Sequence, residues 1–534
     1  MKKMLVILLG LALVFAFAAC GPTEQPAPAP EGGEEEAPAE SAYGDTINYA
    51  INTDAQSLDP QVQNDTTSEQ ICLMLYNTLL RFEEDGSVGP NLAKEWSCSE
   101  DGLTWTFVLN EGVKFHNGKE LTSADVKATF DRALNAEAGG LRTTEVIKMF
   151  TAVEAVDPYT VTITTDAPYG PMEALMCNMF CGIMDSEMID QYGLELGQKV
   201  EAINGTGPYK VVAWNRDSEL QVERFDDYFA GASPTQYVNY LIIPEASARL
   251  IALETGEVDV IQSPSADDLA AIENNPDLTV LRAPSVGQRL FRFGCDDPII
   301  GNTLVRQAIV YAIDRQSIID ALFAGTGYPS TSCLAPVTWG YTDLGVIEQD
   351  QEKAKALLTE AGYPEGFDTK IVTTERYAKG VQLAEVLKSQ LAEVGINAEI
   401  EVWEWSALAA TWDGITAEEF DEPIFIMGAG PSMRDADGGL RGLYTTTETG
   451  LNDRNYGFYS NARVDELVMA GMQETDTVKR AELYAEAEQI LYLDDPAGFW
   501  LFDMYGLVAM STKVENVTLS AISTVTFENA TIAK

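Results

Sequence analysis

The feature that most constrains the fold is a predicted helix that leads directly into a strand between Val381 and Val402. Apolar residues at positions 383, 384, 387, 391 and 394 share one helical face, and this pattern stops at Gly395. Positions 396, 398, 400 and 402 then alternate as in a strand, which would place Trp403 and Trp405 on its opposite face. An apparent strand at 370–374 precedes the helix. A β-α-β unit, with hairpins elsewhere, predicts an α/β or α+β protein with more than one lobe.

The rest of the chain also alternates between strand and helix patterns. Turns at Asp85-Gly86, Asp101-Gly102 and Asn117-Gly118 are of the hairpin type, so residues 85–122 are predicted to form a small antiparallel unit. Further strands are predicted at 46–51 and 161–164, and further helices at 305–313, 354–361 and 478–492. The folded sequence is too long for one simple core, and its length suggests about three domains.

The first 43 residues predict export and a tether. Two lysines precede an apolar run over 4–17, which leads through Ala18-Ala19 to Cys20. This pattern predicts a lipoprotein signal peptide at 1–19, with Cys20 lipidated as the first mature residue; the alternative is an ordinary signal peptide with a chance cysteine. The run is shorter than the roughly 20 apolar residues of a membrane span. Residues 20–43 are rich in Pro, Ala, Glu and Gly and are expected to form a disordered tether.

Charge and cysteine content narrow the partners. The formal net charge of −49 disfavours nucleic acid and anionic lipid surfaces as binding partners, although such acidity also simply keeps an exposed protein soluble. Six cysteines remain beside Cys20. In an exported protein they permit disulfides, in 15 possible connectivities for three bridges, or they are buried free thiols. The pair Cys177 and Cys181 is a weak signal for half a metal site, because no histidine or second pair accompanies it.

The sequence offers little for catalysis. His116 is the only histidine and lies beside a hairpin turn, where a structural role is favoured. The chain contains no His-Glu-x-x-His, no Gly-x-Ser-x-Gly and no phosphate loop with Gly-Lys-Ser/Thr. The stretch Gly205-Thr206-Gly207-Pro208 is better explained as a turn. We therefore expect no enzyme activity, no cofactor and no metal site.

A set of ordered motifs resembles one family across nearly the whole folded chain. The motifs are those at Ser57–Pro60, Tyr76–Leu80, Pro90–Trp96, Asp101–Phe107, Gly112–Gly118, Leu121–Val126, Gly205–Tyr209, Val305–Asp314 and Glu360–Pro364. In this order and spacing they resemble the extracellular solute-binding proteins of family 5, the oligopeptide-, dipeptide- and nickel-binding lipoproteins of ABC importers.

The resemblance implies an α/β, two-lobed, periplasmic-binding-protein-like (Venus-flytrap) fold with an additional third domain. Lobe I would comprise residues 44–72, 184–285 and 498–534, the extra domain residues 73–183, and lobe II residues 286–497. A solute, most simply a peptide, would be enclosed between the lobes. A monomer anchored by lipid to the outer face of the cytoplasmic membrane would then deliver it to an ABC permease and its ATPase. Alternatives are a nickel chelate or other non-peptide solute, and a solute sensor without a permease.

In peptide-binding relatives, a Gly-Trp strand leads to an aspartate that pairs with the ligand's ammonium group. The corresponding segment here is 425–437, where Ala429 takes the tryptophan position and Ser432 the aspartate position. This departure weakens the case for ammonium binding. The resemblance still makes the following residues of the segment ligand candidates: Gly430, Ser432, Arg434, Asp435 and Asp437. Arg434 would favour an anionic group, whereas Asp435 and Asp437 have the alternative role of capping the next helix.

Two other regions of the family's pockets supply candidates. One is the loop after the first strand, at Asp54, Ala55 and Gln56. The other follows the strand at 370–374, where Arg376 and Tyr377 lie; Arg376 could bind a carboxylate through two hydrogen bonds. Trp405 would either stack on a ligand or pack beneath the neighbouring helix.

Overall fold

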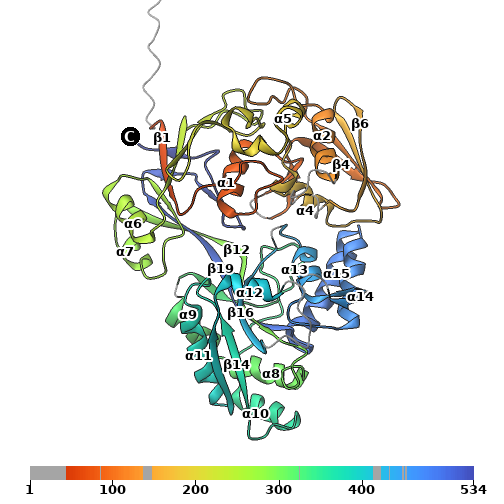
Figure 1. Ribbon diagram of the computed structural model, residues 1–534, viewed down its shortest axis with the longest axis vertical. Coiled ribbons are helices and arrows are strands. Elements are labelled where there is room, and N and C mark those ends of the chain that lie inside the picture. The colour runs from red at the N-terminus through yellow and green to blue at the C-terminus, as the bar shows by residue number, and fades with distance from the viewer. Residues whose placement is uncertain are drawn as a thin grey trace, which may run out of the picture. The chain divides into compact units, whose positions relative to one another are not determined.

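The computed structural model describes residues 44–83, 86–135, 143, 147–323, 325–412, 422–431, 433–447, 450–451 and 454–534. The predicted signal peptide, Cys20 and the predicted tether lie outside these residues, and so does Ser432. Residues 42–534 form one compact unit. The fold is mixed α/β (Figure 1).

One long mixed sheet organises this unit. Its strands are β1 (Thr46–Ile51), β8 (Tyr209–Asn215), β9 (Glu219–Arg224), β10 (Tyr237–Ile242), β11 (Val260–Gln262), β12 (Leu278–Phe293), β13 (Gly327–Pro329), β14 (Phe367–Thr373), β15 (Ile396–Val402), β16 (Ile424–Ala429) and β19 (Gly498–Ser511). The order is β15-β14-β16-β12-β19-β11-β1-β10-β9-β8, and β13 pairs with β19. Only β12 and β19 are long enough to pair with neighbours in both halves of this order.

The pairing of β12 with β19 connects the two lobes. The antiparallel ladder begins at Leu278 opposite Ser511 and ends at Arg292 opposite Gly498, but it is interrupted between Pro284 and Gln288. Before the interruption β19 also pairs with β11, and after it β12 pairs with β16. The two strands therefore leave one lobe and enter the other at this irregular point.

Lobe I is built around β1 and β8–β11. Its helices are α1 (Thr66–Leu75), α5 (Ser186–Tyr192), α6 (Ala246–Thr255) and α7 (Leu269–Glu273), with 3₁₀ turns η3 (Gly193–Gln198) and η4 (Val200–Ala202). The chain's last residues return to this lobe as β20 (Val514–Glu515), β21 (Thr518–Leu519), β22 (Val525–Thr526) and β23 (Thr531–Ile532). Tyr49, Tyr240 and Phe527 meet edge to face in its core, so the C-terminal segment packs directly on β1.

The extra domain contains a four-stranded antiparallel sheet with the order β4-β5-β7-β6. Its elements are β2 (Leu80–Phe82), β3 (Val88–Pro90), β4 (Ala93–Cys98), β5 (Thr104–Leu109), α2 (Ser123–Leu134), β6 (Phe150–Asp157), β7 (Thr160–Thr165), α4 (Met172–Cys177) and η2 (Met179–Cys181). It has a core of its own, which includes Phe107, Phe130 and Ile163. Alternating burial along β5 and β7 shows why these segments form half-buried strands.

Lobe II holds the largest core, which includes Leu383, Leu387, Phe425 and Trp500. Around β12, β14, β15, β16 and β19 lie α8 (Thr303–Ala312), α9 (Arg315–Leu322), α10 (Gln351–Glu360), α11 (Gly380–Ala392), α12 (Trp405–Trp412), α13 (Ala436–Tyr444), α14 (Ala462–Gln473), α15 (Thr477–Gln489) and a π turn η5 (Ile490–Asp494). A two-residue pair, β17 (Thr446–Thr447) and β18 (Gly450–Leu451), completes the lobe. The domain boundaries given from the sequence stay predictions.

Most of the predicted local elements are confirmed. The helix at α11 connects β14 to β15, and these strands pair in parallel, so the β-α-β unit is present. β2 pairs with β3 on either side of the predicted Asp85-Gly86 turn, of which Asp85 lies outside the described residues, and β4 pairs with β5 on either side of the predicted Asp101-Gly102 turn. The strand placement of Trp405 is wrong: β15 ends at Val402, and Trp405 begins α12, which directs its ring back toward the loop after β14.

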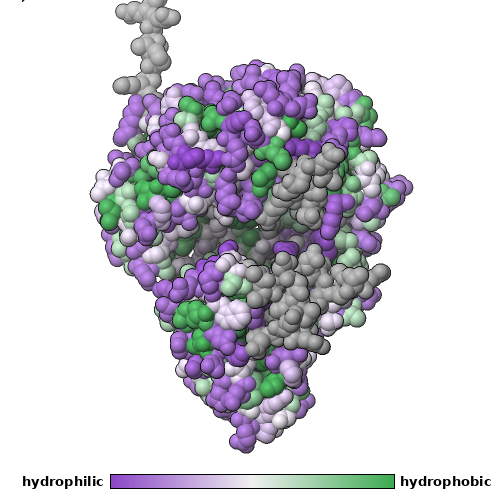
Figure 2. All heavy atoms as spheres, in the orientation of Figure 1, coloured by the Kyte–Doolittle hydropathy of each residue, from purple (hydrophilic) through white to green (hydrophobic). Residues whose placement is uncertain are grey.

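The surface shown in Figure 2 is predominantly hydrophilic, with apolar residues in scattered groups. In the described part of the chain, no helix has the length and apolar character needed to cross a bilayer. The six described cysteines are free, and Cys72, Cys177, Cys181 and Cys333 are buried. The sequence permitted either disulfides or free thiols, and the structure contains free thiols at these six positions.

Candidate functional site

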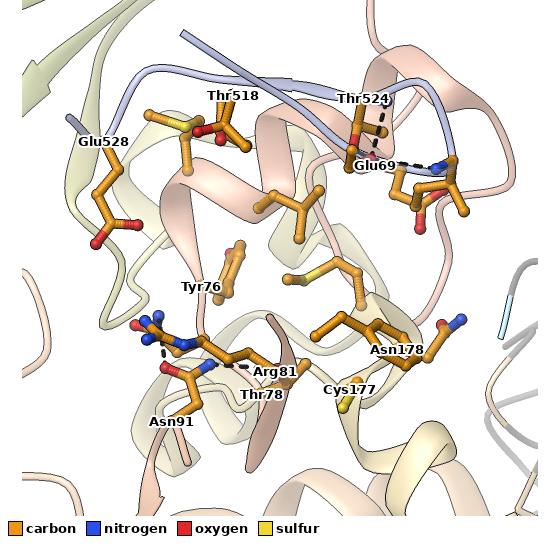
Figure 3. A pocket seen from close by; sticks show the side chains of 18 of the residues that line it. Glu69, Tyr76, Thr78, Arg81, Asn91, Cys177, Asn178, Thr518, Thr524 and Glu528 are labelled. Atoms are coloured by element: carbon orange, nitrogen blue, oxygen red, sulfur yellow. Dashed lines mark hydrogen bonds between the residues drawn. The ribbon is translucent and has the colours of Figure 1, made fainter. Parts of the chain in front are cut away.

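A cavity of about 330 Å³ lies where the extra domain, lobe I and one loop of lobe II meet (Figure 3). The end of α1 and the start of the extra domain supply Tyr76, Asn77, Thr78 and Arg81, and the segment around β21 and β22 supplies residues between 518 and 529. Among the described residues that line it, Arg434 alone comes from lobe II. The cavity therefore changes its lining if lobe II moves.

Polar and apolar groups share the wall of this cavity in nearly equal parts. Asn77 donates to the hydroxyl of Tyr228 (3.3 Å) and accepts from the hydroxyl of Thr206 (2.9 Å). The buried hydroxyl of Tyr76 makes no hydrogen bond in the described part of the chain. Burial raises the pKa of Glu528, and the nearby charge of Arg81 opposes that shift. Such a wall can hydrogen-bond amide and carboxylate groups of a small polar molecule.

Arg434 stands between lobe II and the extra domain. It lies in the loop before α13, its exposed fraction is 8%, and its guanidinium carbon is 4.6 Å from the ring centre of Phe82 on β2. Its carbonyl oxygen accepts a hydrogen bond from the backbone of Trp339 (2.8 Å). Its φ of 51° is left-handed, a conformation that costs a side-chain-bearing residue about 1 kcal/mol or more and persists only where surroundings enforce it.

Asp435 and Asp437, which follow Arg434, already have partners within lobe II. Asp435 is the N-cap of α13, since its Oδ1 accepts from the backbone N–H of Asp437. Its two oxygens also accept from Arg480 on α15, at 2.5 and 2.9 Å. Asp437 pairs in the same two-bond manner with Arg441, at 2.8 and 2.9 Å. These carboxylates shape the loop that carries Arg434.

The glycine of the same loop is a packing requirement. A Cβ at Gly430 would lie 2.5 Å from the carbonyl oxygen of Val286 in β12. The end of β16 therefore passes directly over the irregular part of β12, and only glycine allows that approach.

The loop after β1 is held within lobe I. The carboxylate of Asp54 accepts hydrogen bonds from the indole of Trp214 (2.9 Å) and from the backbone N–H of Asp217 (3.0 Å). Ala55 is buried, with an exposed fraction of 2%, and its carbonyl accepts from Arg216. Gln56 is exposed; its backbone N–H donates to Ser68, and its carbonyl accepts from Gln198.

A cluster of cations and aromatic rings occupies the carboxyl ends of β14 and β16 in lobe II. Arg376 is exposed, and its guanidinium lies 4.4 Å from the ring centre of Trp405. Tyr377 meets Trp405 edge to face at 6.0 Å. On its other side, the ring of Tyr377 covers the guanidinium of Arg289 at 4.6 Å. Sequence reasoning identified three of these residues but missed Arg289.

Arg289 gave a weak signal that was available in the sequence. It stands beside the apolar pair Leu290 and Phe291, where a charged residue demands an explanation. The structure shows that it lies opposite Gly428 of β16, so the glycine predicted as part of the family segment stands beside it.

The loop that carries Arg376 and Tyr377 faces lobe I. Lys379, two residues further on, donates to the carboxylate of Asp267 at 2.9 Å, and Asp267 lies between β11 and α7 of lobe I. Elsewhere, the backbone N–H of Gly170 in the extra domain donates to the carbonyl of Met472 in lobe II at 2.8 Å. Lobe II thus contacts lobe I at the first place and the extra domain at the second.

His116 has a structural environment. Its ring is half-buried, its Nε2 lies 3.1 Å from the carbonyl of Gly207, and its Nδ1 accepts from the backbone N–H of Gly205 at 3.3 Å. Burial lowers its pKa to about 4. The Gly205–Pro208 segment, which the sequence predicted as a turn, is a bend at residues 206–208 beside this ring. Within the described residues, no group of three or more His, Cys, Asp or Glu side chains is placed to hold a metal ion.

Comparison with known proteins gives consistent matches. The model of the family described as bacterial extracellular solute-binding proteins, family 5 (middle region), matches residues 87–450. The glutathione-binding protein GsiB of Salmonella typhi is 30% identical over 451 residues, which cover 84% of this chain and 87% of that protein.

Two solved structures extend the likeness to the fold. The periplasmic binding protein DppA of Helicobacter pylori, solved with the peptide STSA, is 27% identical with a TM-score of 0.75, and the match covers 92% of this chain and 99% of that one. HbpA2 of Haemophilus parasuis is 27% identical with a TM-score of 0.82, and the match covers 91% of this chain and 99% of that one.

Proposed function

Because the chain belongs to the bacterial extracellular solute-binding proteins of family 5, we propose that it captures peptides or related small solutes between its lobes and delivers them to an ABC permease. The family and the two-lobed fold with an extra domain, both expected from the motifs, are confirmed. The family consists of extracytoplasmic binding proteins and not of catalysts.

The cavity at the meeting point of the three regions is the observation that carries this proposal. Its volume of about 330 Å³ falls at the lower end of the usual range for small-molecule sites, which suits a short peptide better than a long one. Arg434 belongs to lobe II while the remaining lining residues belong to the other two regions. A solute that contacts both sides is what would favour closure, since only differential contacts shift a conformational equilibrium.

A peptide or a peptide-like solute is favoured by the mixture of polar and apolar groups in the cavity wall and by the relatives. Glutathione is the ligand named for the Salmonella typhi relative, and a peptide is bound in the Helicobacter pylori structure. We propose Arg434 as the solute contact from lobe II in this cavity. Arg376, Tyr377 and Trp405 lie outside the lining, and we propose them as contacts from the cluster at the ends of β14 and β16. Asp54, Asp435 and Asp437 have protein partners, so we assign them to the scaffold.

A melting screen tests the capture of solutes. The probes are reduced glutathione and a set of di-, tri- and tetrapeptides, and a true ligand should raise the melting temperature in proportion to the logarithm of its concentration. Arg434→Gln should lower the affinity for the best probe at least tenfold. The matched control is Arg463→Gln, which removes an exposed arginine of α14. If no probe or copurified solute stabilises the protein, and X-ray scattering shows no compaction, the proposal fails.

Membrane attachment and the permease partner need separate tests. We propose that Cys20 carries the lipid that holds the protein at the outer face of the cytoplasmic membrane. Cells that express Cys20→Ser should release the protein from the membrane fraction, whereas wild-type protein should be retained. Capture of permease subunits by the solute-loaded protein would support delivery, and a sensor would bind the same solute without them.

A further inference from the structure

Arg289 is a buried cation in the middle of the lobe II sheet. It lies on β12, opposite Gly428 of β16 on one side and Phe502 of β19 on the other. Its exposed fraction is 6%. A guanidinium at such a depth ordinarily has a carboxylate or several carbonyl groups around it, because an uncompensated buried charge is strongly unfavourable.

No such compensation is present in the described part of the chain. The Nε and Nη1 atoms of Arg289 are buried and make no hydrogen bond there, and no ion pair involves this residue. Burial lowers its pKa to about 10, and the only group that counteracts the burial is Tyr377. This lack is notable in a chain with 83 acidic and 34 basic residues.

The surroundings add more positive charge. The charges that act on the hydroxyl of Tyr377 are those of Arg289, Arg376 and Arg292. Arg292, on the same strand, is 3% exposed, and its Nε and Nη2 make no hydrogen bond within the described residues. A strongly acidic protein thus concentrates three arginines at one place, where within the described residues they face aromatic rings and a carbonyl and form no ion pair.

The place is next to the surface that lobe I approaches. Tyr377 is half-buried and Arg376 exposed, and the ion pair of Lys379 with Asp267 shows that their loop faces lobe I. Gly428 leaves the strand without a side chain beside the guanidinium, since a Cβ there would lie 3.4 Å from Nη1 of Arg289 and 3.5 Å from the ring of Tyr377. A rotation of Tyr377 would expose the donors of Arg289 to a group that enters from this side.

We propose that Arg289 is a specificity-determining residue that receives a carboxylate of the captured solute, with Tyr377 covering the guanidinium until the solute arrives. This inference rests on the proposed function and narrows its ligand class to solutes with a free carboxylate. A guanidinium offers two parallel N–H donors that match the two oxygens of a carboxylate. A solute in which that carboxylate is amidated would leave Arg289 buried and unpaired.

The test compares Arg289→Met with wild type in two measurements. Methionine keeps the apolar stem and removes the charge, and Arg282→Met on the same strand is the control, because Arg282 pairs with Glu273 far from the cluster. The first measurement is the melting temperature of protein freed of solute by unfolding and refolding. The second is calorimetry with trialanine, its C-terminal amide and reduced glutathione.

The inference expects wild type to bind the free acid at least tenfold more tightly than the amide, and Arg289→Met to lose that preference while melting no lower than wild type. Equal affinity of wild type for acid and amide would overturn it. A clear drop in the melting temperature of solute-free Arg289→Met would also overturn it, since the guanidinium would then be structural. If no probe or copurified solute binds any variant, it is the proposed function that fails, and the melting comparison still decides whether Arg289 is structural.

Discussion

Lobe II buries two arginines in opposite ways. Arg480 on α15 lies 4.2 Å from the ring centre of Trp339 and is paired through two hydrogen bonds with Asp435. Arg289 on β12 lies 4.6 Å from the ring centre of Tyr377 and has no carboxylate partner in the described part of the chain. Both guanidinium groups are covered by an aromatic ring, so the difference between the two regions is the anion.

This difference separates scaffold from candidate ligand contact. The Asp435–Arg480 pair ties the first turn of α13 to α15 and so fixes the loop that carries Arg434. The charges of Asp435 and Arg480 neutralise each other, so neither side chain needs a charged group from the solute. At Arg289 the protein supplies the cation and leaves the counter-charge to be supplied from outside.

The largest effect is expected for Asp435→Asn. The substitution removes the charge that compensates Arg480 while the arginine stays buried, and breaking such a pair costs about 3–5 kcal/mol. We expect urea unfolding to show a loss of that size. A matched control is Glu486→Gln. Glu486 lies on α15, as Arg480 does, and is the exposed partner of Arg463, so its loss of charge should cause no measurable destabilisation. A loss below about 1 kcal/mol for Asp435→Asn would contradict the assignment of this pair to the scaffold.

A second effect concerns Glu488, a buried carboxylate that forms no ion pair in the described part of the chain. It accepts hydrogen bonds from Ser332 (2.5 Å) and from the backbone of Thr342 (3.2 Å), and burial raises its pKa to about 8. The folded state therefore holds a proton that the unfolded state releases near pH 4.5. Stability contributed by this proton is present below that value and declines as pH rises toward 8.

Unfolding free energies at pH 5 and pH 8 measure this decline. We expect wild type to lose about 1–3 kcal/mol more than Glu488→Gln over that interval, because glutamine imitates the protonated acid and does not titrate. Asp503, whose pKa burial raises to about 6, adds a smaller loss of the same sign, which is common to both proteins. Parallel pH profiles for the two proteins would show that Glu488 does not hold its proton.

A third, smaller effect tests the cover over Arg289. Tyr377→Leu removes the ring that faces the guanidinium, and a desolvated cation–π contact contributes about 1–2 kcal/mol. Trp405→Leu is the control, since the Arg376 beneath its ring is exposed and solvated, so we expect a smaller loss. The measurement is chemical unfolding of solute-free protein. Equal losses for both variants would mean that burial of Arg289 makes no difference.

The same distinction between local and distant contacts explains which features of the structure the sequence predicted. Local periodicity predicted β14, α11 and β15 because their apolar faces depend on neighbours along the chain. The ordered motifs predicted the family and so the two lobes. The predicted placement of Trp405 in the strand was wrong because the strand ends at Val402. No local pattern shows that a helix begins three residues later.

The identity of charge partners could not be predicted, because they come from distant segments. Asp435 and Arg480 are 45 positions apart, and Arg132 of the extra domain reaches Asp59 across 73 positions. The missing partner of Arg289 is harder still to foresee, since it is recognised only after every neighbour is placed. A capping role for Asp435 was available as an alternative, because it requires only the adjacent helix.

The smallest effect is expected for Asp54→Asn, which tests whether a partnered charge in lobe I also belongs to the scaffold. This carboxylate is compensated by neutral donors, the indole of Trp214 and the backbone of Asp217, while Arg216 is exposed and 3.8 Å away. Asparagine keeps one oxygen and presents its amide to a remaining N–H, so we expect a loss of about 1 kcal/mol in unfolding free energy. Calorimetry with the best probe should show less than a twofold change in affinity. A tenfold loss without further destabilisation would instead mean that Asp54 contacts the solute, and the rule that partnered charges belong to the scaffold would then not extend to lobe I.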